Sequence, residues 1–302
     1  MSNHDAYHLA IVGCGTAGVA CVRELTQAPT APRIGSFTLV DRSDIREVNA
    51  NTCPEYAGHA GRPKSLRLAE LAAQWLGRKV PIRWLRASVE ALPWQQLIAS
   101  TGAEGHRGVG PMIAVAGLDD WESRLCLIEE LRRAAPLAGR PIVAIQCGLD
   151  RNEAQVSVFG MVWSDPCPAC GLNVLPETEP CTGRGDLQRE ARAAAALVSE
   201  IVAAFLSGPG ASQAWLNTKT NLVVAKDGGD GFRRLTHFGR RQPGCLGPHS
   251  PNGPLRWDPA SCALRHELDG AVGGTGILPA GHRLEACATV GSTKEDCHGT
   301  II

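Results

Sequence analysis

Through the first half of the chain, short apolar runs alternate with segments that have the polar and apolar spacing of amphipathic helices. The apolar runs predict strands over 9–12, 37–40, 80–85, 112–116 and 142–146, and the helical segments cover 18–25, 65–76 and 121–134. Gly77 and the segment Gly139-Arg140-Pro141 provide the expected stops after helices and before a strand. This alternation predicts an α/β protein with a parallel sheet wound by crossover helices.

From Ala154 onward the pattern changes and indicates antiparallel strands. Strand character is found over 154–163, 220–226 and 231–239, with a long Ala-rich helix over 190–208. Beyond Pro248 the chain is rich in Gly, Pro and His and has no sustained periodicity. We therefore expect a parallel-sheet half over 1–150, an antiparallel half over 151–250 and an irregular C-terminal extension over 251–302.

Charge and cysteine content narrow the possible function classes. The 302 residues include 30 basic and 30 acidic side chains, so no long-range field attracts nucleic acid or an anionic membrane. The polar start MSNHDAYH leaves no room for a signal peptide, and Glu190, Arg192 and Glu200 argue against a membrane span in the Ala-rich helix. We expect a cytoplasmic protein whose 12 cysteines are reduced thiols, metal ligands or a catalytic sulfur.

A glycine-rich turn joins the first expected strand to the first expected helix. Gly13, Gly15 and Gly18 form G-x-G-x-x-G, in which glycines let the backbone approach a pyrophosphate and the helix N-terminus favours its charge. Asp41 ends the second strand, where it is placed to accept ribose hydroxyls. The pattern fits NAD, FAD or ATP, and the alternative is a turn that only packs a helix against a strand.

The loop after Asp41 resembles that of the family of ubiquitin-activating enzymes and their bacterial ThiF-, MoeB- and MccB-like relatives. The family pattern, roughly D-x-D-x-V-x-x-x-N-L-x-R-Q and then G-x-x-K, is similar to Asp41, Asn49 and the AGRPK segment with Lys64. After its fourth strand the family has an Asp, usually followed by Asn, and an Arg one turn later, and this layout is similar to Asp119, Asp120 and Arg124. The resemblance covers about residues 9–249.

This resemblance implies a Rossmann-like fold and adenylation with Mg-ATP. It assigns the nucleotide to Gly13, Gly15, Gly18, Asp41 and Arg124. Asn49 and Lys64 would stabilise the developing charge, and Asp119 would hold the magnesium ion, as a hard carboxylate can. The alternative for the acidic pair is a helix start in which Asp119 or Asp120 is the N-cap.

A C-x-x-C pair, Cys167 and Cys170, can take two corners of a zinc tetrahedron. In the family the second pair comes much later, at a place that here reads RRQPGCLGPHSP and contains Cys245 and His249. The resemblance therefore implies a structural zinc site of three cysteines and one histidine that joins the crossover loop to the C-terminal strands. The alternative is a set of ordinary cytosolic thiols.

Cys181 stands before a Gly-containing loop and a long helix, where ThiF-like relatives have a cysteine. The resemblance implies that it can attack an acyl-adenylate and hold a thioester or an acyl disulfide, with Arg184 and the helix N-terminus lowering the pKa of its thiol. Some relatives lack this cysteine. The cysteines on the expected buried elements, Cys14, Cys21, Cys126 and Cys147, are interpreted as small apolar fillers.

Two departures from the family bear on activity. Thr52 stands where the family has a phosphate-binding arginine. The chain also starts too close to its first strand to contain the N-terminal helix whose arginine, in many relatives, reaches the ATP of the partner subunit. Arg46, Arg62 and Arg67 are candidates to replace either charge, and the sequence does not choose among them.

The favoured function is an ATP-dependent adenylyltransferase that activates the C-terminal carboxylate of a ubiquitin-like or sulfur-carrier protein ending in glycine. By resemblance we expect a homodimer. Three alternatives stand beside it: an enzyme that modifies a peptide or, less favoured by the charge balance, a tRNA base; the inactive subunit of a heterodimer; and an NAD-linked oxidoreductase, which would leave the Asn49 and Lys64 loop unexplained.

Overall fold

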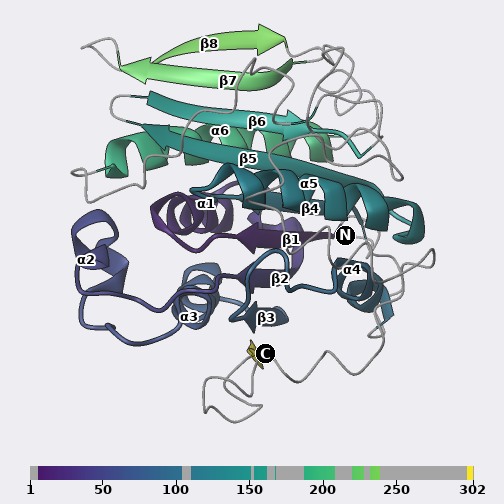
Figure 1. The fold of residues 1–302 in the computed structure, drawn as a ribbon, viewed down its shortest axis with the longest axis horizontal. Coiled ribbons are helices and arrows are strands. Elements are labelled where there is room, and N and C mark those ends of the chain that lie inside the picture. Colours follow the sequence, from purple (N-terminus) through teal and green to yellow (C-terminus); the bar gives the residue numbers. More distant parts are fainter. Residues whose placement is uncertain are drawn as a thin grey trace.

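A computed structural model describes residues 6–103, 110–150, 153–161, 167, 187–207, 220–227, 232–238 and 298–301. In this part of the chain, nine strands form one sheet in the order β8-β7-β6-β5-β4-β1-β2-β3-β9 (Figure 1). Their bounds are β1 Tyr7–Val12, β2 Ile34–Val40, β3 Ile82–Leu85, β4 Met112–Ala116, β5 Ile142–Asp150, β6 Glu153–Phe159, β7 Thr220–Asp227, β8 Phe232–Phe238 and β9 His298–Ile301.

The centre of the sheet is parallel and both of its ends are antiparallel. Strands β3, β2, β1, β4 and β5 run parallel in that order, which is the order of a Rossmann-like nucleotide-binding fold. Strands β6, β7 and β8 continue the sheet antiparallel beyond β5, and β9 pairs antiparallel with β3 at the opposite edge. The prediction of a mostly parallel sheet continued by antiparallel strands is confirmed.

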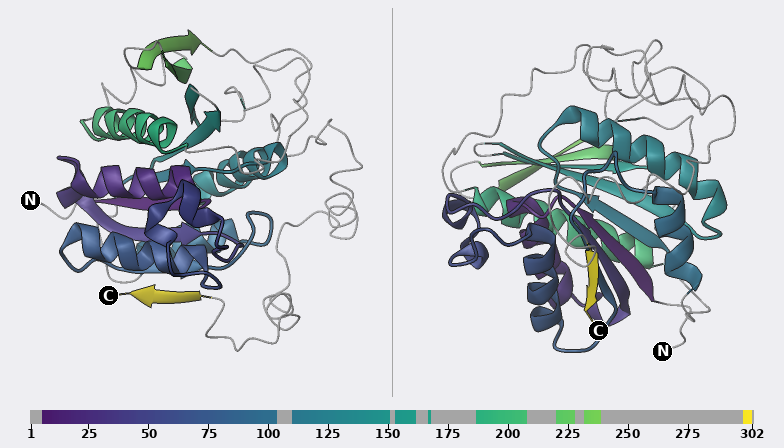
Figure 2. Two further views of the ribbon diagram at one scale, coloured as in Figure 1. Left: turned by 90° about the vertical axis from the view of Figure 1, so that its left-hand side faces the viewer. Right: turned by 60° about the horizontal axis from the view of Figure 1, so that its bottom comes forward.

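Helices cover both faces of the sheet (Figure 2). One face packs against α1 Thr16–Gln27, α3 Lys64–Leu76 and α6 Gln188–Leu206, and the other against α4 Trp94–Ala103 and α5 Trp121–Ala134. The pleat of β1 sends Leu9 and Ile11 into the first core and Ala10 and Val12 into the second, because successive side chains of a strand point to opposite faces. A short helix, α2 Asn49–Thr52, and the single-turn 3₁₀ helices Ala31–Arg33, Pro54–Tyr56 and Ala135–Leu137 lie in the connections.

Two elements differ from the expectation. The apolar and polar spacing did not reveal α4, which is only weakly amphipathic and is buried through Trp94 and Ile98. Residues 298–301, within the extension expected to be irregular, form the edge strand β9. No helix in the described ranges is long and apolar enough to cross a membrane.

His8 is a buried ionisable group within β1. Only 2% of its surface is exposed, and its Nδ1 lies 2.7 Å from Ser36 Oγ. Burial, with smaller contributions from Arg140 and Arg83, lowers the pKa of His8 to about 3. In the unfolded chain His8 has its ordinary pKa of about 6.5, whereas in the folded chain the ring stays neutral down to about pH 3. Below about pH 6.5 the unfolded state therefore binds a proton that the folded state does not, and the fold loses stability as the pH falls towards 3.

Acidification from about pH 7 to about pH 5 is therefore expected to lower the free energy of unfolding, by up to about 1.4 kcal/mol per pH unit below about 6.5 from His8 alone. His8→Gln keeps a polar partner for Ser36 and removes the titration. Urea denaturation of both proteins across this range measures the two slopes. Equal slopes would contradict the prediction.

Candidate functional site

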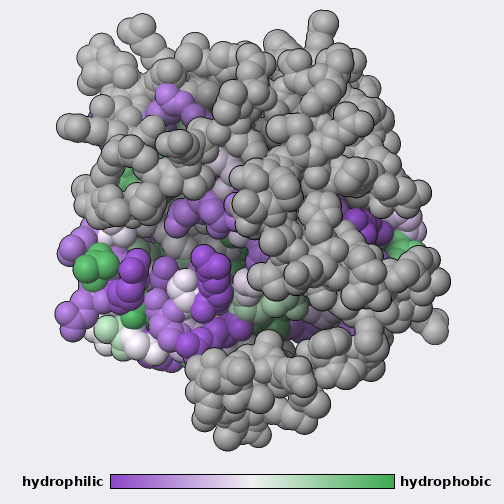
Figure 3. Space-filling model, viewed as in Figure 1, coloured by the Kyte–Doolittle hydropathy of each residue, from purple (hydrophilic) through white to green (hydrophobic). Residues whose placement is uncertain are grey.

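A cavity of about 550 Å³ opens at the carboxyl ends of the parallel strands, a size that suits a small-molecule ligand. It lies where the strand order reverses between β1 and β4, which is the ligand position of this class of sheet. Seven of the residues that the sequence assigned to the nucleotide and its chemistry line it: Gly13, Gly15, Asp41, Asn49, Lys64, Asp119 and Arg124. In the view of Figure 3, hydrophilic side chains gather over α2 and α3.

The glycines of the first turn have different tasks. Gly13 has φ +90°, and a Cβ there would lie 2.3 Å from the carbonyl oxygen of Gly117. A Cβ on Gly18 would lie 2.2 Å from the carbonyl oxygen of Gly13, so this glycine, which does not line the cavity, allows α1 to pack on the turn. A Cβ on Gly15 would meet no atom within 4 Å. The packing interpretation therefore holds for two glycines, and the third leaves space in front of α1.

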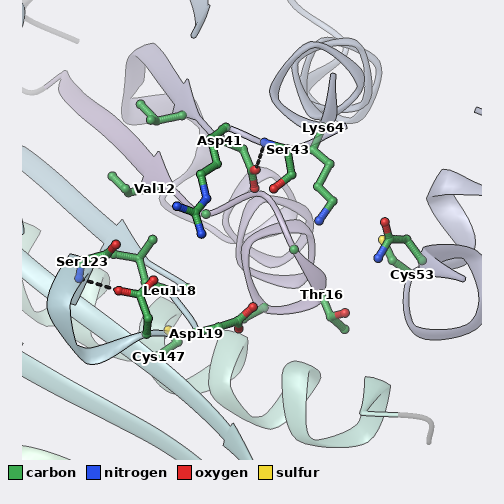
Figure 4. A pocket seen from close by; sticks show the side chains of 18 of the residues that line it. Val12, Thr16, Asp41, Ser43, Cys53, Lys64, Leu118, Asp119, Ser123 and Cys147 are labelled. Carbon is green, nitrogen blue, oxygen red and sulfur yellow. Dashed lines mark hydrogen bonds between the residues drawn. The ribbon is translucent and has the colours of Figure 1, made fainter. Parts of the chain in front are cut away.

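The N-terminus of α1 faces this space. Gly15 is its N-cap, no side chain of another described residue accepts from its first N–H groups, and its first turn holds no acidic residue. Thr16, the first helical residue, lines the cavity (Figure 4). Free N–H groups and the positive end of the helix dipole together favour an anion here.

Asp41 and Tyr56 hold the glycine turn in place through the backbone of Cys14. The Cys14 N–H donates to Asp41 Oδ2 at 2.7 Å, and the Tyr56 hydroxyl donates to the Cys14 carbonyl. Asp41 Oδ1 also accepts from the Ser43 N–H at 2.7 Å. Each carboxylate oxygen keeps a further lone pair, so Asp41 can still accept a hydroxyl from a ligand.

Lys64 begins α3 and reaches the cavity from the side opposite Asp119 (Figure 4). Its backbone N–H donates to the Ser43 carbonyl at 3.1 Å, which fixes the start of α3 beside the end of β2. Its ammonium forms no ion pair with any other described residue. Among the described residues that line the cavity, Lys64 is therefore a lysine whose charge is available to an anionic ligand.

Asn49, at the start of α2, lines the cavity and has two side-chain N–H donors. Its Oδ1 accepts from the Arg46 N–H at 2.8 Å. Because a backbone N–H can only donate, the accepting atom must be the amide oxygen. The Nδ2 group is left with its two hydrogens for a ligand.

Asp119 and Asp120 follow β4 and divide two tasks between them. Asp120 Oδ1 accepts from the Ser123 N–H at 2.6 Å and is the N-cap of α5. Asp119 is exposed, lines the cavity and makes no hydrogen bond to any other described residue. The N-cap interpretation thus applies to Asp120 and leaves the Asp119 carboxylate free for a cation.

Arg124 holds the wall of the cavity together. Its Nε donates to the Leu118 carbonyl at 2.7 Å and its Nη2 to the Cys147 carbonyl at 3.4 Å, while its guanidinium lies 5.2 Å from the centre of the Trp121 ring. These contacts join the loop after β4 to β5. Arg124 and Lys64 both line the cavity, but the Arg124 guanidinium already makes these contacts, whereas the Lys64 ammonium forms no ion pair with any other described residue.

No protein-family model matches this chain, and no curated protein matches it. Solved structures do. They include PaaA, with a TM-score of 0.52 and 14% identity over 78% of this chain and 65% of that chain. E. coli MccB with ATP has a TM-score of 0.53 and 16% identity over 80% of this chain and 67% of that chain.

The microcin C7 biosynthetic enzyme MccB in complex with N-formylated MccA also matches. It has a TM-score of 0.54 and 17% identity, over 82% of this chain and 69% of that chain. The chain has the fold of MccB and PaaA. It spans about two thirds of the length of these proteins, 65% in the case of PaaA. At such identities the likeness establishes the fold.

Three described cysteines near the cavity have a raised thiol pKa. Burial, followed by the charge of Asp41, raises the pKa of Cys14 well above its usual value, and burial with Glu55 does the same for Cys53. Cys21 and Cys147 lie with their sulfurs 4.0 Å apart, and this contact raises the pKa of Cys21. All four are buried. For Cys14, Cys21 and Cys147 this agrees with the interpretation from the sequence that they are small apolar fillers.

The zinc ligands and the acyl-accepting cysteine stay predictions. Cys167 is buried, but Cys170, Cys181, Cys245 and His249 lie outside the described residues. Within the described ranges, no group of three or more His, Cys, Asp or Glu side chains is placed to hold a metal ion.

The arginines that the sequence left open have different surroundings. Arg62 and Arg67 both pair with Glu70, outside the cavity, and Arg46 lines the cavity. Arg42 lines it as well and was missed, although its place directly after Asp41 at the end of β2 was a signal. Apolar side chains that line the cavity were also missed: Val40, Ala87, Val89 and Leu118.

The different tasks of the glycines can be separated by mutation. Gly13→Ala is expected to lower the free energy of unfolding by about 2 kcal/mol or more, because it adds both a positive-φ cost and a backbone clash. Gly15→Ala is expected to cost less than about 1 kcal/mol, the usual loss at an N-cap. Chemical denaturation of both variants measures this difference, and equal losses would contradict it.

Proposed function

We propose that this chain binds Mg-ATP in the cavity and transfers the adenylyl group to a carboxylate. The observation that carries the proposal is the set of unpartnered groups at one sheet edge: the open N-terminus of α1, the Lys64 ammonium, the Asn49 amide donors and the Asp119 carboxylate. Donors and a cation suit phosphates, while a lone carboxylate suits a metal ion that phosphates also bind. Among the structures with this fold, one is of MccB with ATP.

The nucleoside end of the ligand is assigned to β2 and its neighbours. Asp41 has lone pairs left for ribose hydroxyls, and it is fixed by two backbone N–H groups. The apolar side chains of Val40, Ala87, Val89 and Leu118 would face the base. An NAD-linked reaction would use the same turn, but it would leave Lys64 and Asp119 without a task.

The phosphate end is assigned to α1, Asn49 and Lys64. The N–H groups at the start of α1 would hold phosphate oxygens, because the dipole and the missing cap both favour negative charge there. Lys64 and the Asn49 Nδ2 group would stabilise charge that develops during transfer, since they are already oriented towards the cavity. Asp119 would hold Mg²⁺, which when bound offsets the charge of the phosphate oxygens.

In the proposed step, a carboxylate oxygen of the acceptor attacks the α-phosphorus of ATP. A new phosphorus–oxygen bond forms, the bond from the α-phosphorus to its bridging oxygen breaks, and pyrophosphate leaves with the electron pair. The protein supplies positioning and electrostatic stabilisation, and no side chain needs to be covalently modified in this step.

The acceptor we propose is the C-terminal carboxylate of a small protein or peptide. The sequence-based expectation is a ubiquitin-like or sulfur-carrier protein ending in glycine, with later transfer to Cys181 as a further step. A peptide is the second candidate, and it is favoured by the MccB structures that contain MccA. A homodimer, a zinc site and a cytoplasmic location belong to the proposal.

Nucleotide choice is tested by calorimetric titration with Mg-ATP and, separately, with NAD. We expect micromolar binding of ATP and no binding of NAD, because the free cation and free carboxylate suit a polyphosphate with its metal ion. Binding of NAD alone would reject the proposal in favour of an oxidoreductase. If the folded protein binds neither nucleotide, the inactive subunit of a heterodimer becomes the better interpretation.

Catalysis is tested by exchange between ATP and pyrophosphate in the presence of the acceptor. Asp119→Asn removes the charge that would hold the metal ion, so we expect a loss of about 100-fold or more in exchange rate with little change in stability. Glu122→Gln is the matched control, because Glu122 lies in the first turn of the same helix and does not line the cavity. Retained exchange in Asp119→Asn would refute this role.

A further inference from the structure

The loop between Asp41 and α2 places three side chains in one row. The Asn49 N–H donates to the Arg46 carbonyl at 2.9 Å, the Ala50 N–H to Glu47 at 3.1 Å and the Asn51 N–H to Val48 at 3.2 Å. These are the i to i+3 hydrogen bonds of a 3₁₀ turn, which runs directly into α2. In such turns, residues three apart stand on the same face, so Arg46, Asn49 and Thr52 share one face.

This face is the one turned to the cavity. Arg46, Asn49 and Thr52 all line it, while Glu47, Val48, Ala50 and Asn51 do not. The Asn49 side chain adds a second link, because its Oδ1 accepts from the Arg46 N–H at 2.8 Å. The backbone of Arg46 is therefore fixed by the same residue that presents donors to the cavity.

The charge of Arg46 is also available. No acidic side chain in the described ranges pairs with its guanidinium. The two other candidates differ, because the Arg62 and Arg67 guanidinium groups both contact Glu70 and would have to break these contacts to bind a ligand. Of the acidic residues that line the cavity, Asp41 and Asp120 accept from backbone N–H groups, and Asp119 forms no ion pair with Arg46.

We propose that Arg46 is the phosphate-binding arginine of this site and replaces the arginine missing at Thr52. Arg46 stands one turn before Asn49 on the face that lines the cavity, and a turn of 3₁₀ helix rises about 6 Å, a distance that an arginine side chain can span. There its planar fork of donors would bind phosphate oxygens together with the Asn49 Nδ2 group. Arg42 lies on the ribose side, directly after Asp41. This inference rests on the proposed binding of ATP.

The test compares the affinity for ATP and for adenosine in the full chain, by calorimetry, in four variants. Arg46→Ala is expected to weaken ATP at least 10-fold and to leave adenosine unchanged, because the lost contact is to phosphate. Arg62→Ala is the matched control, since it removes an arginine outside the cavity and is expected to change neither affinity. Arg42→Ala tests the other arginine that lines the cavity from the loop after β2.

The fourth variant, Arg46→Ala with Thr52→Arg, returns the charge to the family's position on the same face and is expected to regain most of the affinity for ATP. Unchanged ATP affinity in Arg46→Ala, an equal loss for ATP and adenosine, or a loss confined to Arg42→Ala would each overturn the inference. If the folded wild-type chain binds no ATP, the proposed function itself fails. Thermal unfolding of each variant checks that it is folded.

Discussion

The arrangement of the cavity depends on how the backbone of Cys14 is held. Its N–H donates to Asp41 and its carbonyl accepts from Tyr56, so both hydrogen-bonding groups of this residue are fixed from the far side of the turn. Unpaired backbone groups are costly when buried, which makes this double contact a strong constraint on the turn. The glycine turn also fixes the direction of α1, whose open N-terminus then faces the cavity.

Around this turn, polar groups divide into those that hold the fold and those left for a ligand. Asp120 caps α5 and Arg124 joins two carbonyl groups, whereas Asp119 and Lys64 make no such contacts within the described chain. A group that already has partners loses them when it binds something else, so its net gain is small. Free charged groups beside an open helix N-terminus therefore define the chemistry that the cavity suits.

Much of the fold follows from the sequence, because strands buried on both faces read as continuous apolar runs. Thus β1, β2, β4 and the start of β5 were predicted within a few residues. The helix α4 was not predicted, because its apolar and polar residues form only a weakly amphipathic pattern, and it is held by the packing of Trp94 and Ile98 against the second core. The edge strand β9 was missed because it is defined by pairing with β3, which is distant in the sequence.

The sequence by itself determined which residue types stand at the sheet edge. Gly15, Asp41, Lys64 and Asp119 each follow a strand or begin a helix, and parallel strands bring such positions to one edge. Only the tertiary structure decided which of these groups are free. Whether a carboxylate or a guanidinium has a partner depends on contacts between segments far apart in the chain, and local pattern has no information on such contacts. This is why Arg46 is distinguished from Arg62 only in the folded chain.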